Sequence, residues 1–407
     1  MRWPANTIVR TTPWVASLLL AQVPSPAVAG EPIPTVRQEF RVGQYTFAPQ
    51  VPQGYVLELL NHDMRAPRMI SFAADGSLFV GSRSGAVYRL EPPYRRVRVV
   101  ARLRGYPHSV LVRGGELLVA NTDGIYRTAW DGRRTGLSDD DFRLWVRLPG
   151  GSGHDSRTLR QGPDGRLYVS LGIQGNCSDQ YLDDARPFRD RRGGLFVVDE
   201  SGAEPRLAVY ASGLRNPVGF DWQPGTGALY ASNNGPDHLG FEQPPEVFVK
   251  LSEGSFHGMP WFQFDGREYR RDGCVASQPP RPASQLAPPA ALFPARNAPM
   301  AVAFVPAAVP DPRLRGDVVV ALRGSWGTPP DGSPDGDPAA RRQPALVRLR
   351  FQDGQVVAAE SLVTGFQLED GRRWARPVGV AFGPDGALYF TSDSALQGLY
   401  RLRPEDP

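Results

Sequence analysis

One of the five histidines in this 407-residue chain, His154, lies where a polar loop leads directly into a strand. It stands in the segment GGSGHDSR, in which Asp155 and Arg157 are close neighbours. The segment that follows, GPDGRLYVSLG, predicts a tight turn and then a buried strand. A loop histidine that a rigid strand positions is well placed for chemistry. A structural or surface role is the alternative for each of the five histidines.

Three arginines occupy comparable positions between a loop and a strand. Arg215 stands in GLRNPVGF, Arg323 in LRGSW and Arg376 in WARP. A fixed guanidinium at such a position can face an anionic group. Because no acidic partner lies nearby in sequence, the three cations would suit a ligand with several carboxylates. Salt bridges to acids from other parts of the fold are the alternative.

The segment SNNGPD, residues 232–237, combines a Gly-Pro turn with flanking Asn and Asp side chains. A turn of this kind exposes main-chain carbonyls, and such hard oxygen ligands are the type that calcium uses. A simple turn without a metal is the alternative interpretation.

A turn followed by an apolar strand and then by a second strand recurs six times. Asp-Gly and similar turns supply the positive φ that a tight hairpin needs, and the Leu-Tyr/Phe-Val runs are typical of covered strands. The copies begin at Ala74, Gly114, Gly162, Gly225, Gly316 and Gly383. Repetition at this spacing predicts an all-β fold, a six-bladed β-propeller with long inter-strand loops on one face. A sandwich of unrelated hairpins is the alternative.

The ends and the long insertions define the domain organisation. Residues 1–29 have the pattern of a secretory signal peptide, with Arg2 and Arg10, an apolar core too short to span a bilayer, and a small-residue cleavage site. We therefore expect residues 30–407 to form a single propeller domain, exported to the periplasm or secreted and without stable membrane insertion. The largest insertions are residues 254–294 and 327–344.

The composition bears on partners and on redox state. Removal of the two arginines of the signal lowers the formal charge of +4, and no nucleic-acid-binding motif is present, so we expect no nucleic-acid partner. The two cysteines, Cys177 and Cys274, could form one disulfide in an oxidising compartment, and their spacing fits no metal motif. The sequence leaves this pairing open, as well as the choice between monomer and homodimer.

Taken together, these motifs resemble those of the soluble quinoprotein sugar dehydrogenases, in particular the sorbosone-dehydrogenase-like, aldose-oxidising branch. The resemblance covers nearly the whole mature chain, with its motifs in the expected order. It rests on His154 with GPDGRLY, on the Arg-Asn-Pro-x-Gly motif at 215–219 and on Gly235-Pro236. Tyr106-Pro107-His108, Gly324-Ser325-Trp326 and Arg376-Pro377-Val378-Gly379-Val380 match as well.

The resemblance implies a cleft that binds pyrroloquinoline quinone (PQQ) with Ca²⁺, a small-molecule sugar as substrate and an external electron acceptor. It implies that His154 is the general base for the anomeric hydroxyl and that Arg215 polarises the quinone carbonyl. The implied cofactor-binding residues are Arg215, Asn216, Asn234, Arg323, Arg376 and Gln174, and the implied metal ligands are the carbonyls of Gly235 and Pro236.

Three positions depart from the family pattern. Asn297 and Arg323 stand where the nearer branch usually has histidine, and Ser392-Asp393-Ser394 replaces an Asp-Asp pair. Two other functions remain open: a calcium-dependent propeller lactonase or similar hydrolase, and a non-enzymatic carbohydrate-binding propeller. The first would need an acidic cluster around its metal, and the arginine-rich rim favours the quinone over both.

Overall fold

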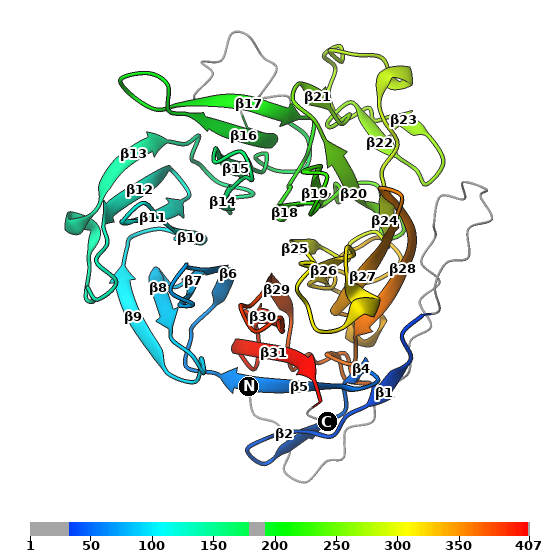
Figure 1. Ribbon diagram of the computed structural model, residues 1–407. Coiled ribbons are helices and arrows are strands. Elements are labelled where there is room, and N and C mark those ends of the chain that lie inside the picture. The colour runs from blue at the N-terminus through cyan, green and yellow to red at the C-terminus, as the bar shows by residue number, and fades with distance from the viewer. Residues whose placement is uncertain (1–31, 179–191, 406–407) are drawn as a thin grey trace.

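Six sheets form a closed ring in the computed structural model, which describes residues 32–178 and 192–405 (Figure 1). Each sheet is one blade, and β6, β10, β14, β18, β25 and β29 are the innermost strands. The predicted all-β, six-bladed propeller is confirmed. The predicted signal peptide, residues 1–29, lies outside the described residues.

The blades consist of the following strands. Blade 1 contains β6 (Pro67–Phe72), β7 (Leu78–Ser82), β8 (Ala86–Leu90) and β9 (Val97–Arg102), and blade 2 contains β10 (Ser109–Arg113), β11 (Glu116–Asn121), β12 (Gly124–Ala129) and β13 (Arg143–Arg147). Blade 3 contains β14 (Leu159–Gln161), β15 (Leu167–Leu171), β16 (Gly194–Asp199), β17 (Arg206–Ser212) and the short parallel strand β21 (Ser255–Phe256), and blade 4 contains β18 (Phe220–Trp222), β19 (Leu229–Asn233), β20 (Glu246–Leu251) and β24 (Ala291–Phe293). Blade 5 contains β25 (Pro299–Phe304), β26 (Val318–Leu322), β27 (Ala345–Gln352) and β28 (Gln355–Val363), and blade 6 contains β29 (Pro377–Phe382), β30 (Leu388–Ser392), β31 (Gly398–Pro404) and β5 (Tyr55–Asn61).

Smaller elements lie outside the blades. Three two-stranded pairs are β1 (Thr35–Arg37) with β4 (Gln50–Pro52), β2 (Phe40–Val42) with β3 (Tyr45–Phe47), and β22 (Phe262–Phe264) with β23 (Tyr269–Arg271). Single 3₁₀ turns are η1 (Asp139–Asp141), η3 (Ala283–Gln285), η4 (Pro312–Leu314) and η5 (Pro338–Ala340).

The recurring Asp-Gly turn has the same structure in three blades. The aspartate carboxylate accepts a main-chain N–H two residues later, at 2.9 Å for Asp75 and 3.1 Å for both Asp164 and Asp385. The glycine after each of them has a φ of +74° to +80°, a conformation that other residues rarely adopt. The turn therefore fixes where the buried strand begins, as the repeat predicts.

An N-terminal strand closes the ring. β5 pairs antiparallel with β31, with Glu58 opposite Arg401, and so completes the last blade from the first part of the chain (Figure 1). The sequence predicts one strand in the lead-in, around residues 44–47, which is β3, but it does not indicate β5. A single apolar run does not reveal which strand it pairs with, and the partner of β5 lies more than 300 residues away in the sequence.

The antiparallel order of the blades brings many loops to one face of the ring. In every blade the innermost strand begins on the face where the second strand ends. We call this the upper face; it carries the residues that precede β14, β18 and β29 and those that follow β15, β19 and β26. The innermost strands also enclose a channel of about 510 Å³, whose walls do not include His154 or Arg215.

The insertion at 254–294 folds over the loop that follows β15. Phe256, Met259, Trp261 and Leu286 of the insertion pack around Ile173, which is fully buried. Burial of this apolar cluster anchors the polar loop on which His154 depends.

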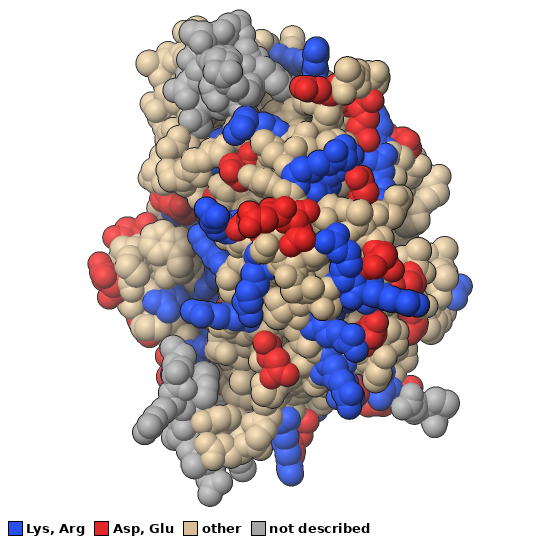
Figure 2. All heavy atoms as spheres, turned by 90° about the vertical axis from the view of Figure 1, so that its left-hand side faces the viewer, with Lys and Arg blue, Asp and Glu red and all other residues tan. Residues whose placement is uncertain are grey.

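The surface gives no sign of a polyanion-binding face on the side that Figure 2 shows. Basic and acidic side chains are interspersed there. Within the described ranges, no helix is long and apolar enough to cross a membrane.

Candidate active site

His154 is held on the upper face by the main chain of Ile173. Its Nδ1 lies 2.7 Å from the Ile173 carbonyl oxygen, and its own main-chain N–H donates to the same oxygen at 3.2 Å. Because a carbonyl oxygen only accepts, Nδ1 carries the proton, and the lone pair of the neutral ring is therefore on Nε2. The ring is thus oriented as a base.

The environment keeps this imidazole neutral. Burial and, after it, the positive charge of Arg215 lower the pKa of His154 from 6.5 to about 4. Two fully buried arginines hold the loop from below. Arg157 donates to the main-chain oxygens of Pro149 and His154, and Arg192 donates to those of Gly172 and His154.

Arg215 lies beside His154 and faces two acceptors. One of its terminal nitrogens donates to the Asn176 side-chain oxygen at 2.6 Å and to the Asp237 carboxylate at 2.9 Å. Its side chain is only 7% exposed, and its Nε has no hydrogen-bond partner among the described residues. A buried, unpaired N–H is costly unless a ligand accepts from it.

Gly172 brings these groups together. The Ile173 N–H donates to the Arg215 carbonyl oxygen at 2.8 Å, which ties the two loops to each other. A Cβ on Gly172 would lie 2.5 Å from the His154 Cβ and 2.6 Å from the Asn216 Oδ1. Only glycine leaves room for the two side chains to stand side by side. His154, Arg215 and Asn216, which the sequence predicts as site residues, therefore converge.

Arg323 and Arg376 form a second group with Arg68. Arg376 donates to the main-chain oxygens of Arg323 and Gly324, both at 2.9 Å. Arg68 and Arg323 share one carboxylate, that of Asp393, at 2.6 and 3.1 Å. Burial, and then the nearby Arg323, lower the pKa of Arg376 well below its ordinary value. The three cations, with the carboxylate of Asp393 beside them, form a positively charged group.

An aromatic cluster positions Arg376. Trp374, two residues earlier, is fully buried and stacks on Phe47 and Phe40 from the N-terminal hairpin at centroid distances of 4.9 and 5.2 Å. Its indole N–H donates to the Gly365 carbonyl oxygen at 2.7 Å. This packing fixes the segment that enters β29, and with it the direction of the guanidinium.

Two predicted cofactor contacts have other partners in the structure. The Asn234 amide nitrogen donates to the Pro299 carbonyl oxygen at 2.7 Å and so ties blade 4 to blade 5. The exposed Gln174 donates to the Ser152 hydroxyl at 3.0 Å, beside the His154 loop. Both residues lie on the upper face, and their roles at a cofactor stay predictions.

The two residues proposed as calcium ligands lie on the same loop but differ in what they contact. The Gly235 N–H donates to the buried carboxylate of Glu246. The Pro236 carbonyl oxygen accepts a hydrogen bond from the guanidinium of Arg296 at 3.3 Å. A ligand atom already bound to a fixed cation does not fit the role of calcium ligand that the resemblance implies for Pro236.

Sequence reasoning missed several residues of this face. Asp237 is contained in the SNNGPD segment, but the sequence does not show that it would pair with Arg215. Arg68 directly follows the first residue of β6, whereas Arg376 directly precedes β29, so the motif around Arg376 does not point to it. Arg296 and Asn176 likewise have no local signal, because they meet the site only through tertiary contacts.

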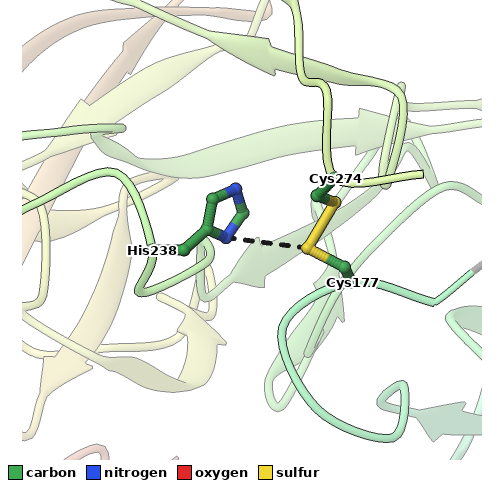
Figure 3. A group of neighbouring side chains, drawn as sticks. All are labelled: Cys177, His238 and Cys274. Atoms are coloured by element: carbon green, nitrogen blue, oxygen red, sulfur yellow. Dashed lines mark hydrogen bonds between the residues drawn. A yellow bond between two sulfur atoms is a disulfide. The ribbon is translucent and has the colours of Figure 1, made fainter. Parts of the chain in front are cut away.

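The two cysteines form a disulfide between the loop after β15 and the insertion. Cys177 and Cys274 are bonded across 97 positions of sequence, and His238 Nδ1 lies 3.7 Å from the Cys177 Sγ (Figure 3). The other ring nitrogen of His238 lies 3.0 Å from the Asp272 carboxylate. Cys177 and His238 adjoin Asn176 and Asp237 in sequence, so this cluster anchors both residues that hold Arg215.

The geometry defines a propeller with a neutral base beside a buried arginine and a separate group of arginines. A family model described as glucose/sorbosone dehydrogenase matches residues 119–401, and the chain belongs to this family of oxidoreductases. An uncharacterised protein of Borreliella burgdorferi is 24% identical over 370 residues, which are 87% of this chain and 90% of that protein.

Solved structures share the fold. An AA12-family carbohydrate-active enzyme of Trichoderma reesei aligns with a TM-score of 0.74 at 19% identity, over 90% of this chain and 100% of that one. The PQQ domain of pyranose dehydrogenase from Coprinopsis cinerea, in its holo form, aligns with a TM-score of 0.69 at 18% identity, over 88% and 97%. PQQ-bound aldose sugar dehydrogenase from Streptomyces coelicolor aligns with a TM-score of 0.57 at 15% identity, over 87% and 100%.

Proposed function

We propose that this protein is an exported quinoprotein dehydrogenase that oxidises the C1 hydroxyl of aldose sugars to lactones, with PQQ as the hydride acceptor. One observation carries the proposal: a neutral imidazole with its lone pair on Nε2 stands beside a buried arginine whose Nε has no partner among the described residues. Membership of the sugar dehydrogenase family and PQQ in the names of two structural neighbours support it.

The donor set on the upper face fits a tricarboxylate quinone. Arg323, Arg376 and Arg68 would hold the carboxylates, because among the described residues Asp393 is the one acid that forms an ion pair with this group. The Nε of Arg68 is buried and has no hydrogen-bond partner among the described residues, as is also true of Arg215. Arg215 and Asn216, between these cations and His154, would hold the quinone carbonyl.

The chain's own residues perform the proton chemistry. The bound quinone supplies the hydride acceptor, and the protein supplies position and charge. Nε2 of His154 takes the proton from the anomeric hydroxyl, and the Nδ1–H···O=C bond to Ile173 keeps the ring in the required tautomer. Arg215 stabilises the negative charge that develops on an acceptor oxygen next to it. An external electron acceptor then completes the cycle.

Reconstitution tests the proposal. The purified apoprotein is mixed with PQQ, and reduction of an artificial dye is followed with glucose and other aldoses, in buffers with Ca²⁺ and with EDTA. Dye reduction that depends on both PQQ and aldose is the expected result. Absence of dye reduction in both buffers, with PQQ bound, would remove the dehydrogenase from consideration.

The structure gives little support to the alternative function, a calcium-dependent lactonase. In the part of the chain that the structure describes, the one group of three potential metal-ligating side chains is Cys177, His238 and Cys274, and two of these form a disulfide. The acidic cluster that such a hydrolase needs is therefore not found among those residues. Lactone hydrolysis by the apoprotein with metal alone would nevertheless favour it.

A further inference from the structure

A buried arginine on the upper face binds oxygen atoms of the loop that contains the two implied calcium ligands, including the Pro236 carbonyl oxygen. Arg296 is 7% exposed, and its guanidinium donates to three main-chain carbonyl oxygens, those of Pro236, Asp237 and Gly240. It also donates to Oδ1 of the Asp237 carboxylate. Four hard oxygens thus surround one fixed positive charge.

The positive charge of Arg296 opposes the binding of a divalent ion at the Pro236 carbonyl oxygen. Calcium needs six to eight oxygen ligands at about 2.3–2.6 Å. An ion bound to the Pro236 oxygen would lie within a few ångströms of a guanidinium that stands 3.3 Å from the same atom. At that separation two positive charges repel each other strongly in a buried environment.

The charge of Arg296 reaches the site through Asp237. While Oδ1 of this carboxylate binds Arg296, Oδ2 binds Arg215 at 2.9 Å. The Asp237 N–H also donates to the Asn176 side-chain oxygen, which accepts from Arg215 as well. Arg296 is therefore a positioning residue: it fixes the carboxylate that fixes the arginine beside His154.

Two features indicate that the surroundings of Arg296 determine its position. Its backbone has a φ of +70°, a left-handed conformation that costs free energy for a residue with a side chain and persists only where the surroundings determine it. The loop at 327–344 covers the guanidinium so closely that a Cβ on Gly332 would lie 3.4 Å from one of its terminal nitrogens. Arg157 and Arg192 hold carbonyls of the His154 loop in the same way.

We propose that the guanidinium of Arg296 replaces calcium in this protein, so that the loop at 235–240 is organised, and the quinone is bound, without a divalent cation. The part that concerns the quinone rests on the proposed function. The part that concerns the loop does not, since it is a statement about the apoprotein.

Direct titration tests the apoprotein. The protein is stripped with EDTA, and CaCl₂ is added in a calorimeter while a parallel sample is melted with EDTA or with CaCl₂. No binding in the micromolar range and an unchanged melting temperature are expected. Micromolar binding of one calcium ion, lost when Pro236 and its loop are replaced by a glycine-serine segment, would overturn the proposal.

Quinone binding is then measured by quenching of tryptophan fluorescence, in EDTA and in CaCl₂. The dissociation constants should agree within about twofold, whereas a loss of more than tenfold in EDTA would contradict the proposal. If PQQ binds in neither buffer, the proposed function fails, but the calorimetric result still decides whether Arg296 has replaced the metal.

The variant Arg296→Met sharpens the test. We expect PQQ to bind at least tenfold more weakly in EDTA, and CaCl₂ to restore part of the loss because the freed carbonyls can then bind calcium.

Arg342→Met is the matched control: its guanidinium contacts Glu242 and the Ala295 carbonyl but none of the oxygens that Arg296 binds. Calcium should leave the control unchanged. Weakening in Arg296→Met that calcium does not relieve would contradict replacement of the metal. If this variant does not fold, the measurements on the unaltered protein stand alone.

Discussion

The two sides of the upper face differ in how their charges are balanced. On the base side, which consists of His154, Arg215, Asp237, Glu246 and Arg296, two guanidinium groups face two carboxyl groups. On the arginine side, which consists of Arg68, Arg323, Arg376 and Asp393, the guanidinium groups of Arg68 and Arg323 share one carboxylate, and that of Arg376 donates to main-chain oxygens.

The two sides differ in the role that we expect of them: the base side would act in proton transfer, and the arginine side would bind the cofactor. Burial and the positive charge of Arg215 keep the imidazole neutral, which a base requires, and the Asp237 carboxylate holds Arg215 in one orientation. On the arginine side, burial and then the nearby Arg323 lower the pKa of Arg376, and an arriving polyanion would relieve the repulsion between the two cations. We therefore expect substitutions on the base side to change turnover and those on the arginine side to change cofactor affinity.

The largest effect is expected for His154→Ala. Removal of a general base costs about 10²–10⁴-fold in rate, and the arginine side is untouched, so kcat should fall by that factor while PQQ still binds. Steady-state kinetics and fluorescence quenching check the two quantities. His62→Ala, at an exposed position, is the control. Normal turnover in His154→Ala would remove this residue from the mechanism.

The second effect concerns Arg323→Met and Arg376→Met. Each should weaken PQQ binding by roughly 10- to 100-fold, since a hydrogen bond to a charged group contributes about 1.5–3 kcal/mol. The kcat at saturating PQQ should stay within about threefold of the parent. Arg215→Met, on the base side, should instead lower both affinity and kcat. Equal kinetic profiles for all three variants would erase the distinction between the sides.

The third prediction is a pH profile. Because the pKa of His154 is lowered to about 4, its base form persists well below pH 6, and kcat/KM should fall only as the pH drops through about 4. Arg215→Met removes the second cause of this lowering, so the acid limb should move toward 6.5. Arg323→Met serves as the comparison and should leave the limb in place. An acid limb near 6.5 in the parent protein would show that burial and the charge of Arg215 do not lower the pKa of His154.

The smallest effect is on stability. Burial lowers the pKa of His257 to about 4, as it does for His154. Between pH 6.5 and 4 the unfolded chain binds protons at these two rings that the folded chain does not, so the free energy of unfolding should fall as the pH is lowered through that window. Urea unfolding at several pH values measures this slope. His257→Gln should reduce it, and an unchanged slope would show that this ring titrates equally in both states.

The sequence predicted the blades more completely than the site. The turns that open the six copies, among them the Asp-Gly turns at Asp75, Asp164 and Asp385, act locally, so their repetition predicts the number of blades. The contacts of Arg296 with the loop at 235–240 and the pairing of Arg68 with Asp393 connect residues 56 to 325 positions apart. No local pattern encodes such pairs, because the chain's closure into a ring brings them together.

The strand β5 has one more consequence. The ion pair between Arg68 and Asp393 joins the first blade to the last. The last blade is itself completed by the pairing of β5 with β31, which joins the two ends of the chain. A ribosome must therefore have finished nearly the whole polypeptide before the arginine side can form. Deletion of the chain from residue 398 onward would remove β31, the partner of β5. We expect the ring to open and the arginine side to lose its arrangement, while the other five blades stay folded.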